Sequence, residues 1–121
     1  MSLAADMLAC EQALLHTDFS DDIVGLDRLL APDFVEISNG RVSERAHVVA
    51  WLLRKDPAAR WSFADVHVSE LAQGIRLVRY RAQQILPQVS ASNGALHSSI
   101  WIFSRDTSCW QLRFHQATRL T

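Results

Sequence analysis

Residues 109–118 read CWQLRFHQAT and have the alternation of a β-strand, in which neighbouring side chains point to opposite faces. The polar face holds Gln111, Arg113 and His115, and the opposite face holds Trp110, Leu112, Phe114 and Gln116. The preceding stretch, LHSSIWIFSRD, has the same strand character, and residues 106–108 provide a turn between the two. We therefore predict a long antiparallel hairpin at this end of the chain.

Two further strands precede this hairpin. Residues 75–85 alternate, with Val78, Tyr80 and Ala82 on one face and Arg79 and Arg81 on the other. Residues 61–68 also alternate, but their apolar positions change phase near Ala64 and Asp65, which predicts a β-bulge there. With a turn at Gln73–Gly74, these strands and the hairpin form a four-stranded antiparallel meander.

The first half of the chain has helical spacing. Residues 3–17 place an apolar stripe on one helix face, with Asp6 and Glu11 away from it. This stripe consists of Leu3, Met7, Cys10 and Leu14. A second helix is predicted from the cap at residues 20–22 as far as Pro32, and a third from Ser43 to Lys55.

One strand interrupts these helices. Residues 34–38, FVEIS, favour β structure, and Asn39–Gly40 tolerate the positive φ of a tight turn. Because the helices mostly precede a run of antiparallel strands, the order indicates an α+β fold with three helices packed on an antiparallel sheet. At 121 residues we expect a single domain, residues 1–121.

Composition excludes several classes of function. Twelve Lys and Arg against thirteen Asp and Glu give a net charge of −1, which argues against a nucleic-acid partner. No stretch approaches the about 20 apolar residues of a membrane span, so we expect a cytoplasmic protein without a membrane partner. The cysteines and histidines lack the spacing of metal ligands, and no glycine-rich phosphate loop is present. We therefore expect no metal and no cofactor.

Residues 29–52, LLAPDFVEISNGRVSERAHVVAWL, together with SSIW (98–101) and WQLRFHQAT (110–118), resemble the SnoaL-like domains of the nuclear transport factor two and ketosteroid isomerase superfamily. The resemblance implies a cone-shaped, cystatin-like fold, in which a strongly curved antiparallel sheet wraps the helices and a pocket opens at the wide end. Many such proteins are homodimers through the sheet face. Their activities range from isomerase, cyclase and dehydratase to binding alone, and the catalytic residues of the steroid isomerases have no counterparts here that can be matched one by one.

Glu36 is a candidate general base, because a carboxylate held in an apolar cup has its pKa raised by desolvation. Alternatively, Glu36 faces solvent or pairs with an arginine such as Arg41, Arg79 or Arg113. Tyr80 is a second candidate, whose hydroxyl could donate to a ligand oxygen. The alternative for Tyr80 is a core tyrosine with a protein partner.

His115 could serve as acid, base or hydrogen-bond donor. If the apolar face of its strand packs on the helices, however, strict alternation points His115 and Arg113 away from the cup, toward solvent or a dimer interface, and we favour this arrangement. If the polar face of this strand instead lines the cup, Arg113 is a candidate ligand-binding residue. Trp51 and Trp101 are further candidates, since aromatic rings line small-molecule pockets.

The sequence leaves two functions open. We favour a binding protein that holds a hydrophobic or weakly polar small molecule in the cup, since no acid and base are forced together by spacing. The alternative is a cofactor-free lyase or isomerase, in which Glu36 abstracts a proton and Tyr80 or His115 polarises a carbonyl. A dimerisation module would require a large exposed apolar patch.

Overall fold

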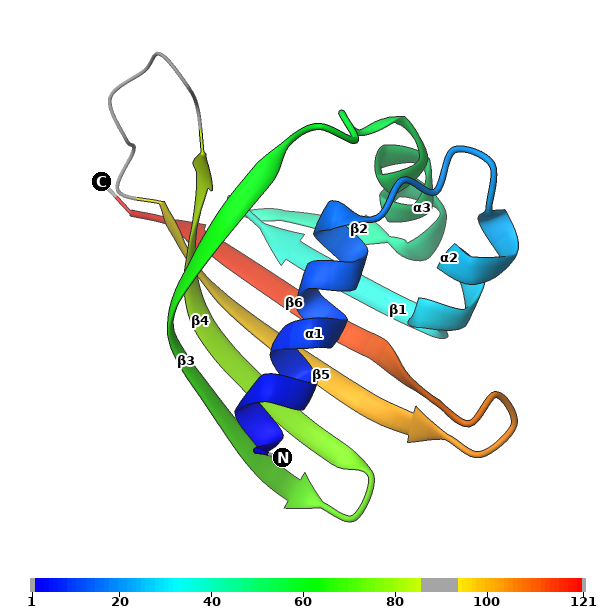
Figure 1. Ribbon diagram of the computed structural model, residues 1–121, viewed down its shortest axis with the longest axis vertical. Coiled ribbons are helices and arrows are strands. Elements are labelled where there is room, and N and C mark those ends of the chain that lie inside the picture. Colours follow the sequence, from blue (N-terminus) through cyan, green and yellow to red (C-terminus); the bar gives the residue numbers. More distant parts are fainter. Residues whose placement is uncertain (1, 86–93, 121) are drawn as a thin grey trace.

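The computed structural model describes residues 2–85 and 94–120. Within these residues, three helices and six strands form an α+β fold, in which the helices lie on one face of a curved, open sheet (Figure 1). The helices are α1 (Leu3–His16), α2 (Ile23–Leu29) and α3 (Arg45–Arg54). The strands are β1 (Leu30–Ser38), β2 (Arg41–Glu44), β3 (Arg60–Ala72), β4 (Ile75–Ile85), β5 (Ala95–Ser104) and β6 (Cys109–Arg119). The polar connection expected over residues 87–93 lies outside the described residues.

The strand order in the sheet is β2-β1-β6-β5-β4-β3. The predicted meander of β3 to β6 and the β1–β2 turn at Asn39–Gly40 are confirmed, and the pairs β1–β2, β3–β4, β4–β5 and β5–β6 are antiparallel. The expectation of a wholly antiparallel sheet is wrong, because β1 and β6 pair in parallel. These two strands are far apart in the chain, so no turn between them fixes their direction and no local pattern reveals it.

A single core joins the helices to the inner face of the sheet, which we define as the face that the helices cover. Met7 of α1, Leu26 of α2 and Val48 of α3 pack with Val78 and Trp101 of the strands. The alternation predicted for β4 is confirmed, because Val78, Tyr80 and Ala82 are buried on this face.

Helix α1 buries a carboxylate that the sequence analysis placed on its polar side. The buried residues are Met7, Glu11 and Leu14, whose spacing of four and three residues is that of one helix face. The predicted cap is confirmed, since Ser2 Oγ accepts the Ala5 amide at 3.1 Å. Glu11 therefore faces the sheet, and the prediction that it lies off the stripe is wrong.

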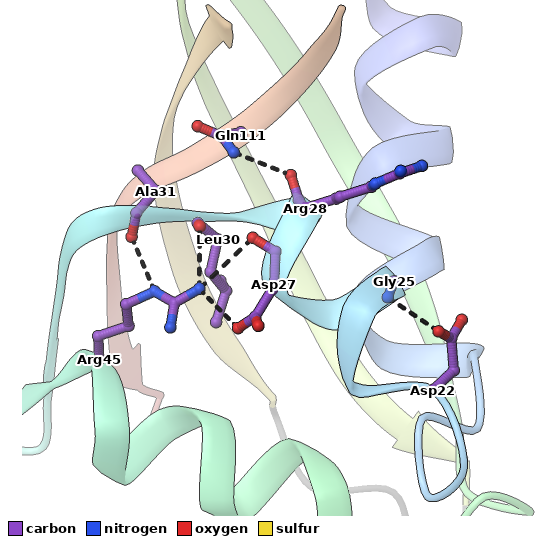
Figure 2. Close-up of polar contacts among 8 residues, drawn as sticks. All are labelled: Asp22, Gly25, Asp27, Arg28, Leu30, Ala31, Arg45 and Gln111. Atoms are coloured by element: carbon purple, nitrogen blue, oxygen red, sulfur yellow. Dashed lines mark hydrogen bonds and ion pairs between the residues drawn. The ribbon is translucent and has the colours of Figure 1, made fainter. Parts of the chain in front are cut away.

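Helix α2 is short and is held at both ends (Figure 2). Asp22 caps it by accepting the Gly25 amide at 2.9 Å. At the other end Arg45 of α3 donates to the carboxylate of Asp27 at 3.0 Å and to the carbonyl oxygens of Leu30 and Ala31. The chain is already extended at Leu30, so α2 ends before the predicted Pro32.

Two local differences from the sequence predictions concern the edge of the sheet beside α3. Residues 41–44 form strand β2, which pairs with β1, and α3 begins only at Arg45. Ser43 is thus a strand residue, and Glu44 stands at the cap position without a side-chain cap bond.

The bulge predicted in β3 is confirmed: the register shifts between Ala64 and His67, and Asp65 has a φ of 56°.

Candidate functional site

The candidate site is built on a row of side chains that crosses the inner face of the sheet. Val78 of β4 is paired with Ser99 of β5, Ser99 with His115 of β6, and His115 with Glu36 of β1. Since Val78 is fully buried in the core, the residues in register with it face the same side. His115 and Glu36 therefore lie next to each other beneath the helices.

A bulge in β6 is what brings His115 to this face. Trp101 is paired with Leu112 and Ile100 with Phe114, so Arg113 is one extra residue on β6. An extra residue reverses the alternation beyond it. Leu112 and His115 consequently both face inward although they are three residues apart. The favoured prediction that His115 points away from the cup is wrong for this reason.

Glu36, His115 and His97 form a chain of hydrogen bonds. The Nδ1 atom of His115 lies 2.8 Å from Glu36 Oε2, and its Nε2 atom lies 2.9 Å from His97 Nδ1. The side chains of His115 and Glu36 are 14% and 27% exposed. With Glu36 ionised, Nδ1 of His115 must donate to it, because a carboxylate only accepts hydrogen bonds. Both nitrogens of His115 thus have protein partners.

A second group adjoins this chain through an aromatic stack. The ring of Tyr80 is stacked on His97, with centroids 4.9 Å apart and an interplanar angle of 7°. The Tyr80 hydroxyl donates to Glu11 Oε2 at 2.9 Å, and Trp101 Nε1 donates to Glu11 Oε1 at 3.0 Å. Glu11 is buried, and these two hydrogen bonds hold its carboxyl group inside the core.

Burial keeps two members of this network neutral. Desolvation, together with the neighbouring His115, lowers the pKa of His97 to about 4. Desolvation and the adjacent Glu11 carboxylate raise the pKa of Tyr80. At neutral pH, His97 therefore carries no charge and Tyr80 keeps its hydroxyl proton.

An inner pocket of about 60 Å³ opens between this network and the helices. Glu36 and His115 line it with Glu11, Tyr80 and His97, and the remaining wall is apolar. The apolar wall consists of Leu14, Leu15, Leu30, Phe34, Val48, Leu52 and Leu112. A carboxylate–histidine pair in such surroundings is an arrangement suited to proton transfer.

An outer pocket of about 490 Å³ shares Glu36 and Val48 with the inner one. It lies between the β1–β2 hairpin and α3, and its other lining residues are Ser38, Asn39, Arg41, Ser43, His47 and Trp51. Trp51 is 43% exposed, as an aromatic residue available to a ligand would be. The two pockets thus adjoin at Glu36 and Val48, and the Glu36 side chain borders both.

The remaining candidate residues lie elsewhere. Trp101 is fully buried and bonded to Glu11, so it does not line either pocket. Arg113 pairs with Asp33 at 3.1 Å on the surface and lines neither pocket. The structure thus corrects the expectation that these two residues contact a ligand in the cup.

Sequence reasoning missed Glu11 and His97. The signal for Glu11 was its position between Met7 and Leu14 at helical spacing, and the signal for His97 was its phase with Ser99 and Trp101 in one strand. In residues 2–85 and 94–120, no group of three or more His, Cys, Asp or Glu side chains could hold a metal ion. No helix in this part of the chain is long and apolar enough to cross a membrane.

No protein-family model matches the sequence, and no curated protein does either. Solved structures, however, share the fold. An NTF2-like protein of unknown function in nutrient uptake from Rhodospirillum rubrum is 20% identical, with a TM-score of 0.73 over 96% of this chain and 99% of that one. An NTF2-like protein from Cytophaga hutchinsonii is 17% identical, with a TM-score of 0.76 over 99% and 100% of the two chains.

A third similar structure is a domain of unknown function from Nostoc punctiforme, described as having a cystatin-like fold. It is 15% identical, with a TM-score of 0.70 over 100% of this chain and 80% of that one. These likenesses extend over the whole arrangement of helices and strands. The chain therefore has the NTF2-like, cystatin-like fold.

Proposed function

We propose that this protein binds a small organic molecule across the inner and outer pockets and transfers a proton on it, as a cofactor-free isomerase or lyase. The observation that carries the proposal is the hydrogen bond between Glu36 and His115 at the wall of an apolar pocket. A carboxylate that is positioned within hydrogen-bond reach of a bound molecule can act on it as a general base.

Glu36 is the proposed general base. Its Oε2 atom is held by His115, and among the described residues its Oε1 atom has no hydrogen-bond partner. In the proposed step Oε1 takes a proton from an activated C–H group, and the released electron pair forms a double bond. In a lyase a leaving group departs with its own electron pair. In an isomerase the π electrons of an adjacent carbonyl move onto its oxygen as the new double bond forms, and the carbonyl is restored when Glu36 returns the proton to another carbon.

His115 and Tyr80 take roles different from those expected from the sequence. The nitrogens of His115 are bonded to Glu36 and His97, and the Tyr80 hydroxyl is bonded to Glu11. Neither side chain has a free hydrogen to polarise a ligand carbonyl. In our proposal His115 is a positioning residue, which orients the Glu36 carboxylate, and Tyr80 supports His97 by stacking.

The test uses 5-nitrobenzisoxazole, whose ring opens to a coloured phenolate when a base removes its C–H proton. We expect the protein to accelerate this reaction and Glu36→Gln to lower the acceleration by about 100-fold or more, as for removal of a general base. Glu44→Gln is the matched control, because Glu44 is an exposed residue outside both pockets. Equal rates for Glu36→Gln and the unmodified protein would contradict the proposed role of Glu36.

Binding without turnover is the second candidate function, favoured by the mainly apolar lining of the inner pocket. A ligand that raises the melting temperature of the protein while no proton-transfer probe reacts would support it.

We also infer a homodimer that forms through the outer face of the sheet. In the described chain all three helices lie on the inner face, which leaves the outer side chains of β1, β4, β5 and β6 available to a second copy.

A further inference from the structure

The outer pocket has one cationic wall and one aromatic wall. Ser38 is paired with Arg41, and Glu36 with Ser43, so these four residues lie on the inner face of the β1–β2 hairpin. Across the pocket, His47 and Trp51 come from successive turns of α3. Both walls are fixed by secondary structure, which is the requirement for a defined binding site.

The two basic side chains of the outer pocket, Arg41 and His47, are unpaired. Within the described residues, the side chains of Arg41 and His47 have no hydrogen-bond or ion-pair partner, and both residues are exposed. The ionisable side chains near them differ in this respect: Arg45 is bonded to Asp27, and Glu36 is bonded to His115. A guanidinium group presents several donors in one plane and suits a carboxylate with two oxygens.

We propose that the outer pocket recognises the carboxylate of a small organic acid through Arg41 and His47, while the apolar body of that acid lies against Trp51. The carbon that reacts would then face Glu36, and this last part rests on the proposed function. The substrate class is then an organic acid with a flat apolar group.

The charges in the pocket also set the orientation of the acid. Glu36 is paired with Ser43, and Arg41 lies two residues further along β2, toward the hairpin turn. Two residues of a strand span about 7 Å. A carboxylate is attracted by Arg41 and repelled by Glu36, so it takes the outer end of the pocket. We therefore expect the reactive carbon to be separated from the carboxyl group by about the width of an aromatic ring or a short chain.

The test compares 3-phenylpropionate with 3-phenylpropanamide, which has the same shape without the charge, by isothermal titration calorimetry. We expect the acid to bind at least about tenfold more tightly than the amide. Arg41→Gln should remove this preference by weakening the binding of the acid alone. Trp51→Ala should weaken both compounds. Arg105→Gln is the control, because it removes the same charge from an exposed position outside the outer pocket and should keep the preference.

Three results would overturn the inference: equal binding of acid and amide, no binding of either compound, or a preference that survives Arg41→Gln. Failure of the proposed function is recognised separately, because binding of the acid does not require turnover. If the acid binds through Arg41 but Glu36→Gln leaves the rate of benzisoxazole opening unchanged, the acid site stands and the role of Glu36 as a base falls.

Discussion

His97 links the site to pH at the scale of a single residue. Its pKa is about 4 in the folded protein, whereas histidine in an unfolded chain titrates near 6.5. The unfolded state therefore binds the additional proton first as the pH falls. Stability that is fully present above pH 6.5 is lost progressively toward pH 4, by up to about 3 kcal/mol from this residue.

We predict that His97→Gln reduces this loss. Urea denaturation at pH 7 and pH 5 should show a smaller decrease in the free energy of unfolding for His97→Gln than for the unmodified protein. His47→Gln is the control, since His47 is exposed and its replacement should leave the decrease unchanged. An NMR titration in which His97 gains a proton near pH 6.5 would disprove the assignment.

The buried Glu11 leads to a second prediction at this scale. Tyr80→Phe removes one of the two hydrogen bonds to its carboxyl group and leaves a buried oxygen without that donor. We expect the free energy of unfolding to fall by about 1–3 kcal/mol, the usual cost of an unsatisfied buried polar group. In the Glu11→Leu background the same substitution should cost much less, and equal costs in the two backgrounds would show that the bond contributes little.

At the scale of the element, the bulge of β6 determines which side chains enter the site. Arg113 is the extra residue between the pairs Trp101–Leu112 and Ile100–Phe114. Its deletion leaves Leu112 and His115 facing inward and Phe114 facing outward between them, in regular alternation. A deletion of Ser99 in β5 instead removes a residue from a regular ladder and turns His97 to the outer face.

We therefore predict that the pKa of His97 stays low in the Arg113 deletion, whereas the Ser99 deletion raises it or unfolds the protein. NMR titration of His97 is the measurement. Arg113→Ala serves as the matched variant, because it removes the exposed pair with Asp33 and keeps the bulge. That substitution should cost less than about 1 kcal/mol. Loss of the low His97 pKa in the Arg113 deletion would contradict this account of the strand.

The two bulges also show what could be predicted from the sequence. In β3 the apolar residues change phase on either side of Ala64 and Asp65, so the bulge was visible. In β6 no change of phase marks Arg113, because the residues on either side of it follow strict alternation in the sequence. The order of elements and the core face of β4 were predictable because they depend on local patterns. The orientation of His115 was not, because it depends on pairing between strands.

At the scale of the whole molecule, the outer face of the sheet leads to a prediction of association. Leu77, Ile100, Phe114 and Val35 are in register across four strands and form an apolar row on this face. Leu96, on the same face, is 49% exposed. A row of this kind is typical of an interface between subunits.

Sedimentation velocity tests the association. We expect the unmodified protein to sediment as a dimer and Leu96→Glu as a monomer, because a charge buried in the interface loses its hydration. Val24→Glu is the control: Val24 is 62% exposed on α2, away from the sheet face, and its replacement should leave the dimer intact. A dimer that persists in Leu96→Glu would place the interface elsewhere.

The extra residue in β6 affects how this chain is compared with other sequences. In a protein of the same fold with a regular last strand, a pocket histidine follows the inward leucine by two positions, whereas here His115 follows Leu112 by three. A correct alignment of the two requires a one-residue gap at Arg113. Without that gap, His115 is matched to a side chain on the outer face of the sheet, and the two pockets look chemically unrelated even where their acid–base groups coincide in space.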